Sequence, residues 1–485
     1  MRKNKIVISA ICLIISAGAM LSACKEDKNS NLHDDVTTLK WCIFSENLND
    51  MDRVLEEFNK KLYEKAGFKL EVELINGSVY NDKINMYIAA NNDFDLAWIG
   101  YLTGYDAVVA NEGLYDLTDM VEKSELKNTM PQYVLDSATI NGRIYAIPNM
   151  QVLFEKRQVT VKKDLAQKYN LDISKVRKTE DIEPFLEKVR DNEPDIYPFG
   201  LSMHEMSFQS VDDYSTSDTI NYCYVTYENG ELTCKPYYEN EVWKSKVNKL
   251  HDWYKKGFIR KDAAAVQDDS KDRLNGMYAA WVDHNKPGGY YEFKKQGNSY
   301  DICYAVVSQP YIAPTSSNAT MIGVNAHSKH PQEAFKLIEL MNTDKELYNM
   351  LVYGIEGVHY NKIGENRVTI TDGSYGIVGW KLGNQFNAYF LDDQSEEDWK
   401  LTQEMNEESP KSKFIGFHAD ITNIKKELTQ LGNVKKKYEF LLTGAEDPEL
   451  YWEDYAAEME AAGMEKVCKE TRKQLEEFIK EKNIK

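Results

Sequence analysis

The sequence predicts an α/β fold, and three observations support this prediction. Segments with the patterns of strands and helices alternate over residues 39–99, which is typical of a mostly parallel sheet covered by helices. Of the 485 residues, 42% are apolar and 28% are charged, a composition typical of a globular protein rather than a disordered chain. The length is sufficient for two or three lobes, each with a hydrophobic core of its own.

The N-terminal residues have the pattern of an export signal. Three basic residues precede an apolar run at 6–20, which is shorter than the about 20 residues that a permanent membrane helix needs. Leu-Ser-Ala-Cys at 21–24 resembles a bacterial lipobox, in which Cys24 receives a diacylglyceryl group and becomes the new N-terminus. We therefore predict a lipoprotein signal peptide at 1–23 and a flexible polar tether at 24–38. The alternative is an ordinary secretory signal.

The first part of the globular region alternates strands and helices. Apolar residues recur with the helical period over 51–66, and Gly67 is suited to end that helix. The predicted order is strand 39–44, helix 51–66, strand 68–75, helix 80–90 and strand 94–99. Ligands of such a sheet lie beyond the carboxyl ends of its strands, which are followed here by residues 45–47, 76–78 and 100–103.

A second lobe is predicted to begin after the extended run 144–149, which Pro148 interrupts. The patterns that follow predict helices at 179–190 and 241–256, strands at 274–281, 300–307 and 321–324, and a helix that begins near Ser328 and Pro331. The segment 447–485 is a charged helical stretch with regularly spaced apolar residues.

The charge of the chain excludes some partners. The formal net charge is −19, and removal of the signal leaves 56 basic against 78 acidic residues, or −22. An acidic surface repels phosphates, so nucleic acid is not an expected partner, and polyanionic ligands would need a local basic pocket.

The cysteines do not form a disulfide framework, because the five outside the signal region are odd in number and scattered along the chain. Asn229-Gly230 predicts a hairpin turn that pairs Cys223 with Pro236 and Cys234 with Val225. The two cysteines are then diagonal neighbours, and a disulfide between them is possible but not favoured. The eight histidines are dispersed, and Glu356 and His359 lack the spacing of a zinc protease, so no metal or other cofactor is expected.

Several segments resemble one protein family. They are residues 113–118 (Gly-Leu-Tyr-Asp-Leu-Thr), 141–148 (Asn-Gly-Arg-Ile-Tyr-Ala-Ile-Pro), 328–334, 353–360 and 383–386 (Gly-Asn-Gln-Phe), and the closing run 442–474. In this order they resemble extracellular solute-binding proteins of family 1, the substrate-binding lipoproteins of ABC importers. The last three segments resemble the LipO-like branch, whose C-terminal domain is of unknown function.

The resemblance implies a periplasmic-binding-protein-like fold with two α/β lobes, a hinge, an interlobe cleft and a helical C-terminal extension. It places lobe 1 at 39–148 and 310–370, lobe 2 at 149–309, and the C-terminal region packed on the lobes at 371–485. The hinge is expected near 147–152 and 307–313. The expected partners are a small-molecule solute and the permease subunits. The protein is expected to be a monomer that is attached to the membrane through its lipid.

The candidate ligand-binding residues combine aromatic platforms with polar groups at strand ends and near the late crossover. They are Glu46, Trp98, Tyr101, Thr103, Trp281, Asp283, Trp380, Asn384 and Gln385. A sugar packs its C–H face on an aromatic ring, while its hydroxyls need fixed donors and acceptors. For the tryptophans the alternative is a role in the core, and for the carboxylates a helix cap or a solvated position.

The leading hypothesis is a non-enzymatic binding protein that delivers a saccharide or oligosaccharide to a permease on the extracytoplasmic face of the membrane. A peptide is the alternative ligand. A secreted glycoside hydrolase would need a pair of catalytic carboxylates, and no motif in the sequence singles out such a pair. A surface adhesion protein is a third hypothesis, supported only by the lipid anchor and the acidic charge.

Overall fold

The computed structural model describes residues 36–45, 48–201, 218–266, 269–284, 286–290, 300–371 and 373–484. The predicted signal peptide, Cys24, most of the tether and the candidate Glu46 lie outside these ranges. Among the described helices, none combines the length and the apolar character that crossing a bilayer requires.

The first sheet has the strand order β2-β1-β3-β14-β6. Its strands are β1 (Thr38–Phe44), β2 (Lys69–Ile75), β3 (Leu96–Gly100), β14 (Thr320–Val324) and β6 (Ala146–Pro148). β1 pairs in parallel with β2 and β3, whereas β14 runs antiparallel to β3 and β6. The three predicted N-terminal strands and the strand at 321–324 are confirmed.

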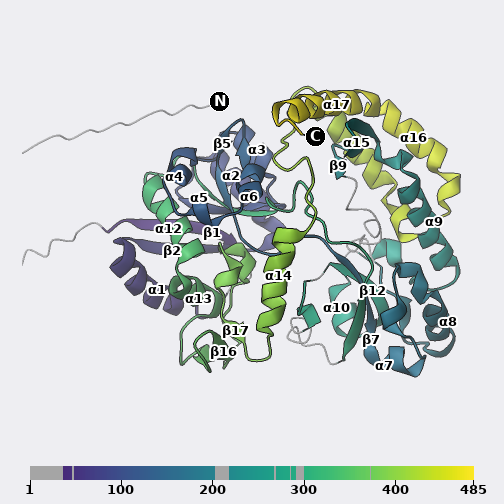
Figure 1. Cartoon of the computed structure of the whole chain (residues 1–485), viewed down its shortest axis with the longest axis horizontal. Helices are drawn as coiled ribbons and strands as arrows, with labels where there is room; N and C mark the ends of the chain where they lie inside the picture. The colour runs from purple at the N-terminus through teal and green to yellow at the C-terminus, as the bar shows by residue number, and fades with distance from the viewer. Residues whose placement is uncertain are drawn as a thin grey trace, which may run out of the picture. The chain divides into compact units, whose positions relative to one another are not determined.

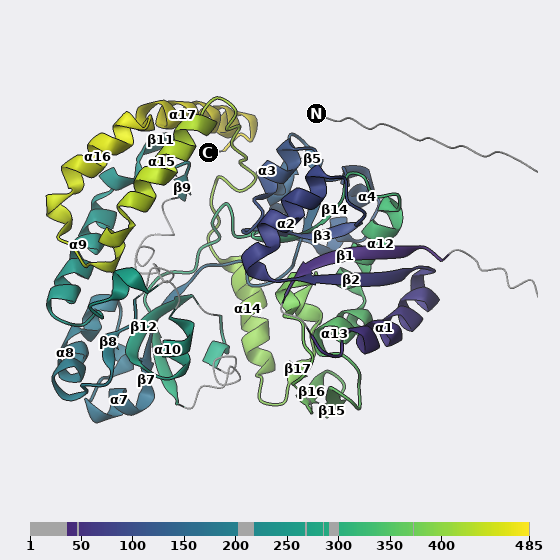
Figure 2. The same ribbon diagram turned by 180° about the vertical axis from the view of Figure 1, so that it is seen from behind.

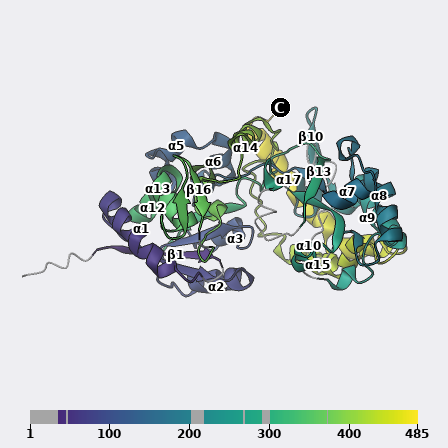
Figure 3. The ribbon, with the colours of Figure 1, turned by 90° about the horizontal axis from the view of Figure 1, so that it is seen from below.

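Helices cover both faces of this sheet. α1 and α13 lie on one face and α2 on the other (Figures 1 and 3), with α12 packed against α13. Their bounds are α1 (Met51–Ala66), α2 (Gly77–Ala89), α12 (Pro331–Thr343) and α13 (Lys345–Tyr353). α1 buries one stripe of apolar side chains, and Gly67 ends it in the left-handed conformation, as the sequence predicts.

Short elements complete the first lobe. They are α3 (Tyr105–Ala110), α4 (Thr118–Glu122), α5 (Leu126–Thr129), α6 (Gln132–Ser137), the strand pair β4 (Thr139–Ile140) and β5 (Arg143–Ile144), and the small sheet β15 (Tyr360–Lys362), β16 (Arg367–Ile370) and β17 (Phe390–Leu391).

The second sheet has the order β13-β7-β12-β8, and Figure 2 shows β7, β8 and β12 together with α8 beside them. The strands are β7 (Arg157–Lys162), β8 (Tyr197–Phe199), β12 (Tyr278–His284) and β13 (Ile302–Val306). The helices of this lobe within the described residues are α7 (Lys163–Lys168), α8 (Glu183–Asn192), α9 (Glu241–Lys255) and α10 (Ser270–Leu274). α8 and α9 confirm the helices predicted near 179–190 and 241–256.

One strand prediction was wrong in its position. The expected strand 274–281 begins only at Tyr278, because α10 extends to Leu274 and Gly276 follows with a positive φ of 70°. Trp281 consequently lies in the middle of β12 rather than at its end.

A hairpin extends from the second lobe. It consists of β10 (Cys223–Glu228) and β11 (Glu231–Pro236), with β9 (Asp218–Ile220) at its edge. Asn229 and Gly230 both have positive φ, the requirement of a type I′ turn. The predicted register is confirmed, since Cys223 pairs with Pro236 and Val225 pairs with Cys234.

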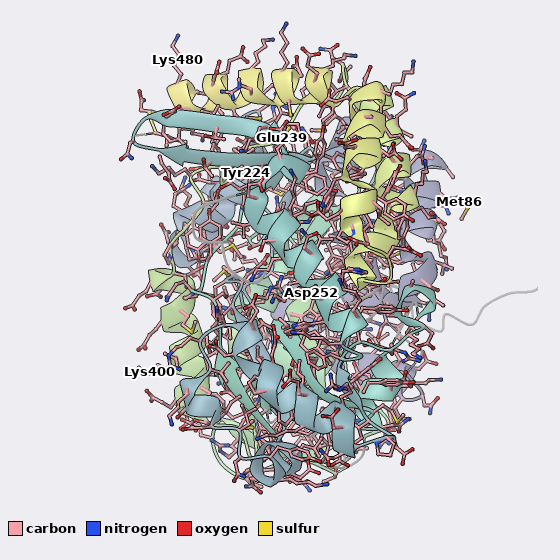
Figure 4. The ribbon with its side chains drawn as sticks, turned by 90° about the vertical axis from the view of Figure 1, so that its right-hand side faces the viewer. Met86, Tyr224, Glu239, Asp252, Lys400 and Lys480 are labelled. Carbon is pink, nitrogen blue, oxygen red and sulfur yellow. The ribbon has the colours of Figure 1, made fainter. Side chains whose placement is uncertain are left out.

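The C-terminal region packs in two places. Tyr375, Ile377 and Leu382 join the core of the first lobe, whereas α15 (Lys425–Lys437), α16 (Trp452–Ala461) and α17 (Met464–Glu481) form a third core with the hairpin and α9. Figure 4 shows the hairpin, with Tyr224 labelled, lying along α17, which carries Lys480. Gly444 allows close contact with α9, because a Cβ there would lie 2.4 Å from the Leu250 carbonyl oxygen.

Among the described residues, three chain segments lead from the first lobe to the second sheet or to the C-terminal helices. The first two follow β6 and β13, near the segments in which the hinge is expected, and they pair at Glu155 and Tyr311. The third follows α14 (Glu396–Glu408), and the sequence analysis did not anticipate it. It pairs Lys411 with Ile312, and the N–H of Ile312 donates to the Pro410 carbonyl at 2.9 Å. The crossover is therefore a hydrogen-bonded unit of three segments.

Candidate ligand-binding site

An aromatic surface, which we define as Phe44, Tyr101 and Trp380, lies where β1 and β3 end. Trp98 on β3 is fully buried, and its ring centroid lies 4.5 Å from that of Phe44 and 5.4 Å from that of Tyr101. Trp380, in the 3-10 turn η6 (Gly379–Lys381), lies 5.6 Å from Phe44. Tyr101 is 63% exposed and Trp380 is half-buried. These two rings are therefore accessible to a ligand, and Trp98 supports them from the core.

The turn after β3 explains why Tyr101 is exposed. Gly100 has no room for a side chain, because a Cβ there would come within 2.1 Å of the Ala319 carbonyl oxygen. The hydroxyl of Thr103 is buried and accepts a hydrogen bond from the Gly100 N–H at 3.0 Å. Thr103 therefore stabilises the turn that carries Tyr101, and its hydroxyl is directed into that turn.

Buried polar side chains hold Trp380 against the strand ends. The ammonium of Lys381 donates to the Phe44 carbonyl at 2.9 Å and lies 3.9 Å from the centroid of the Phe44 ring. The side chain of Asn149 donates to the Trp380 carbonyl at 3.0 Å. The backbone on both sides of the aromatic surface is thus fixed by hydrogen bonds, which favours a preformed platform.

Asn384 and Gln385 lie at the next turn, η7 (Gln385–Asn387). The Asn384 side chain caps this turn, because its Oδ1 accepts from the Phe386 N–H at 3.0 Å. The backbone N–H of Gln385 donates to the Met150 carbonyl at 2.7 Å, which joins the turn to the first crossover segment. Of the two predicted residues, Gln385 lines a pocket.

This pocket has a volume of about 310 Å³ and lies between η7, β17 and α14. It is lined by Gln385, Phe386, Ala388, Phe390, Glu396, Glu397, Trp399, Lys400 and Gln403. The Trp399 ring packs edge-on against Phe386, with centroids 5.4 Å apart, and the ammonium of Lys286 from the other lobe lies 4.7 Å from its centroid. The pocket combines aromatic rings with amide and carboxylate groups, a mixture that can bind a polyhydroxylated ligand.

Trp281 and Asp283 belong to a polar cluster on the second lobe. Trp281 is 1% exposed, and its indole N–H donates to Asp283 Oδ2 at 2.6 Å. Arg273 donates to Asp283 Oδ1 at 3.1 Å, and its guanidinium lies 5.5 Å from the centroid of Trp281. The indole of Trp281 is therefore packed inside the lobe, and the partly exposed Asp283 is the member of this cluster nearer to solvent.

The described residues contain no group of three or more His, Cys, Asp or Glu side chains arranged to hold a metal ion. His359, for which a metal role was considered, is fully buried. Its Nδ1 accepts from the Ile355 N–H at 3.0 Å, and its Nε2 lies 3.0 Å from Asp50 Oδ2. These contacts give His359 a structural role in the turn before β15.

The structure adds residues that the sequence analysis did not select. Phe44 and Lys381 complete the aromatic surface, and Phe386 and Trp399 line the pocket. Phe386 belongs to a segment that carries the family resemblance and could have been found there. Trp399 lies in an amphipathic helix where an isolated tryptophan cannot be distinguished from a core residue by its spacing.

A model of bacterial extracellular solute-binding proteins matches residues 45–347, which is more than half of the chain. The chain belongs to this family. A model of a domain of unknown function (DUF3502) matches residues 413–480, which contain α15, α16 and α17. Both findings confirm the family resemblance predicted from the sequence.

Individual relatives agree with this assignment over nearly the whole chain. The carbohydrate ABC transporter substrate-binding protein of Streptococcus pneumoniae serotype 4 is 26% identical over 491 residues, which cover 97% of each chain. The solved structure of the N-glycan transport solute binding protein NgtS from Streptococcus pneumoniae has a TM-score of 0.82 at 25% identity, and the match covers 92% of this chain and 100% of that one. A structure of NgtS in complex with Man5GlcNAc has a TM-score of 0.73 at 25% identity, with 93% and 100% covered.

These comparisons confirm the two-lobed fold class and the functional class. The protein is a substrate-binding component of an ABC importer and acts on the extracytoplasmic side of the membrane. Its relatives are transport proteins rather than enzymes.

Proposed function

We propose that this protein captures an oligosaccharide between its lobes and delivers it unchanged to a membrane permease. The observation that supports this most directly is the aromatic surface, where Tyr101 is 63% exposed beside the half-buried Trp380. Accessible rings at the carboxyl ends of parallel strands are suited to pack against the C–H face of a sugar.

The pocket beside η7 supports an oligomeric rather than a monomeric ligand. Trp399 and Phe386 offer further aromatic area, and Gln385, Gln403 and the carboxylates of α14 offer donors and acceptors for hydroxyl groups. The short segment from Trp380 to Gln385 joins the aromatic surface to the pocket along the chain, and we propose that one chain of sugar units contacts both. The relative NgtS, solved with Man5GlcNAc, supports the same class of ligand.

The charge of the protein favours a neutral glycan. The chain has a formal net charge of −19, and the pocket itself contains Glu396 and Glu397. Polyanionic sugars would be repelled unless basic side chains neutralised them, and among the described residues Lys400 is the one basic residue that lines the pocket, with Lys286 beside Trp399. Neutral oligosaccharides are not subject to this electrostatic repulsion.

The second lobe would contribute through the residues that follow Trp281. Lys286 already contacts the Trp399 ring, and a Cβ at Gly288 would come within 2.7 Å of a carboxylate oxygen of Asp398. A ligand that contacts both lobes is bound fully only in the closed state, so its binding shifts the population toward that state. The permease would recognise the closed form. We further propose that a lipid on Cys24 holds the protein, as a monomer, at the membrane.

A thermal-shift screen of neutral oligosaccharides, acidic oligosaccharides and oligopeptides tests the ligand class. A ligand that binds the native state raises the melting temperature by mass action. We expect a rise with neutral oligosaccharides, larger for a pentasaccharide than for a disaccharide. A rise with peptides alone would refute the proposal.

Variants then test the site. Tyr101→Ala and Trp380→Ala should each weaken the affinity for the best oligosaccharide, measured by titration calorimetry, by about 10-fold or more, because a stacked ring is lost. Tyr63→Ala, which removes a 44% exposed tyrosine from α1, is the matched control and should leave the affinity unchanged. Equal affinities in all three variants would place the site elsewhere.

A further inference from the structure

Three cysteines from distant parts of the chain meet in the core that the hairpin forms with the C-terminal helices. Cys223 lies on β10, Cys234 on β11 and Cys468 on α17. The sulfur atoms of Cys223 and Cys468 are 3.0 Å apart, although 245 positions separate the two residues. Cys223 is fully buried, Cys234 is 5% exposed and Cys468 is half-buried. All three are thiols in the structure.

All three side chains interact, and the geometry favours one pair. Cys223 and Cys234 are diagonal neighbours in the hairpin register, and although their side chains interact, the Cβ atoms of such positions are typically farther apart than the about 3.8 Å that a disulfide needs. The Cys234 sulfur is instead directed toward the carbonyl oxygen of Cys468, at 3.7 Å. Cys223 and Cys468, by contrast, come from separate elements and hold their sulfur atoms 3.0 Å apart, close to bonding distance.

Contacts outside the cluster hold α17 in this position. Arg472, one helical turn after Cys468, donates to the carbonyl oxygens of Leu232 and Cys234, each at 3.0 Å. Val467, Thr471 and Leu475 of α17 are fully or almost fully buried. The thiol pair is therefore brought together by packing that does not depend on a covalent bond, and closing the bond needs little additional ordering.

We propose that Cys223 and Cys468 form a disulfide that fastens α17 to the hairpin of the second lobe, and that Cys234 remains a thiol. The protein acts outside the cytoplasm, where disulfides persist. The half-buried Cys468 is the accessible member of the pair, so an oxidant is expected to react there first.

The oxidant required is an external disulfide, of a small thiol or of a thiol oxidoreductase. The Cys468 thiolate attacks one sulfur of this disulfide, which breaks its S–S bond, forms a mixed disulfide on Cys468 and releases one thiolate. The Cys223 thiolate then attacks the Cys468 sulfur and expels the second thiolate. The two protons from the cysteines end on the two released thiolates. One external disulfide is thus reduced to two thiols while the pair loses two electrons.

The bond would fix the domain of unknown function to the second lobe. Residues 413–480, which match that domain, contain Cys468, whereas Cys223 belongs to the hairpin. The C-terminal helices would then follow the second lobe in any movement of the lobes. This inference does not depend on which solute the protein binds.

Peptide mapping of the full chain tests the proposal. The protein is incubated with oxidised glutathione, its remaining thiols are blocked with N-ethylmaleimide, and peptides are analysed by mass spectrometry without reduction. We expect peptides containing residues 223 and 468 to be joined, with the loss of two hydrogens, and to separate after treatment with dithiothreitol. The same link should form in Cys234→Ser and in Cys303→Ser, a control outside the cluster, and should be absent from Cys468→Ser.

Three outcomes would overturn the proposal. They are alkylation of both Cys223 and Cys468 after oxidation, a link that involves Cys234, and a glutathione adduct on Cys468 that does not resolve. Peptide mapping of the unsubstituted protein is sufficient to distinguish these outcomes. The test therefore remains valid even if a variant does not fold. A rise of about 2–6 °C in the melting temperature on oxidation, lost again on reduction, is the expected accompanying change.

Discussion

Asn406, near the end of α14, is predicted to hold the crossover together. The side chain is 4% exposed, and its Oδ1 accepts from the Leu153 N–H at 2.8 Å. Its Nδ2 donates to the Gln151 carbonyl at 2.6 Å. One amide therefore satisfies a donor and an acceptor of the first crossover segment, and Asn406→Ala leaves both without their partner.

The expected cost follows from the burial of these two groups. Leu153 is 1% exposed, so its unsatisfied N–H costs about 1–3 kcal/mol, whereas the Gln151 carbonyl, in a half-buried residue, costs roughly 0.5–1.5 kcal/mol. We expect Asn406→Ala to lower the free energy of unfolding by about 2–4 kcal/mol. At an unfolding entropy of about 2.1 cal/mol/K per residue, the unit Thr37–Lys485 should lose about 2–4 °C in melting temperature.

Differential scanning calorimetry measures this loss directly. Glu408→Ala, which truncates an exposed side chain at the end of the same helix, is the matched control and should change the melting temperature by less than about 1 °C. If Asn406→Ala melts at the temperature of the unsubstituted protein, the two backbone groups find other partners, and the described role of α14 in the crossover is incorrect.

Two further predictions concern acid stability and membrane attachment. Burial alone would raise the pKa of Glu183, but hydrogen bonds from Lys256, Trp253 and Lys249 outweigh it and lower the pKa to about 2. The stabilisation by Glu183 is therefore complete above its unfolded value of 4.5 and is lost as the pH falls from 4.5 toward 2, so chemical denaturation should show a weaker acid dependence for Glu183→Gln; an unchanged dependence would contradict this. For the anchor, Cys24→Ser should abolish incorporation of labelled palmitate into the protein, as autoradiography of the immunoprecipitated protein would show, and incorporation equal to that of the unsubstituted protein would refute lipidation at Cys24.

The first sheet could be predicted from the sequence because its signals are local. The alternation of strand and helix patterns over residues 39–99 reports burial on a regular face, and Gly67 marks a helix end through its own backbone preference. The hairpin register at Asn229-Gly230 followed in the same way, since a two-residue turn fixes the pairing of the strands beside it.

The features that the sequence did not reveal depend on contacts between distant segments. The third crossover segment has no pattern of its own, and only its pairing with Ile312 identifies it. The start of β12 was misplaced because the apolar residues near Leu274 belong to a short helix, which Gly276 separates from the strand. Cys468 and Cys223 likewise lie side by side only in the tertiary structure, because 245 positions separate them in the sequence.

For the candidate site, the sequence indicates suitable residue types but does not show which of them are exposed in the folded protein. The sequence selected Trp98, Tyr101 and Trp281 as aromatic residues at strand ends, and the structure gives them different exposures. Trp98 and Trp281 are buried in their lobes, whereas Tyr101 is exposed in the turn that Gly100 and Thr103 shape around it. A tryptophan in a strand satisfies the pattern of a core residue and of a ligand platform equally well, so exposure alone separates the two roles.

Helix α14 connects the candidate site to the crossover. Trp399 and Gln403 line the pocket, and Asn406 on the same helix holds Gln151 and Leu153 through hydrogen bonds. Seven residues separate Trp399 from Asn406, a distance of about 10 Å along a rigid helix. A ligand that packs on Trp399 therefore acts on the same rigid element that holds the first crossover segment. If the first crossover segment is the hinge predicted from the sequence, this arrangement links occupation of the pocket to lobe closure without requiring the ligand to contact that segment.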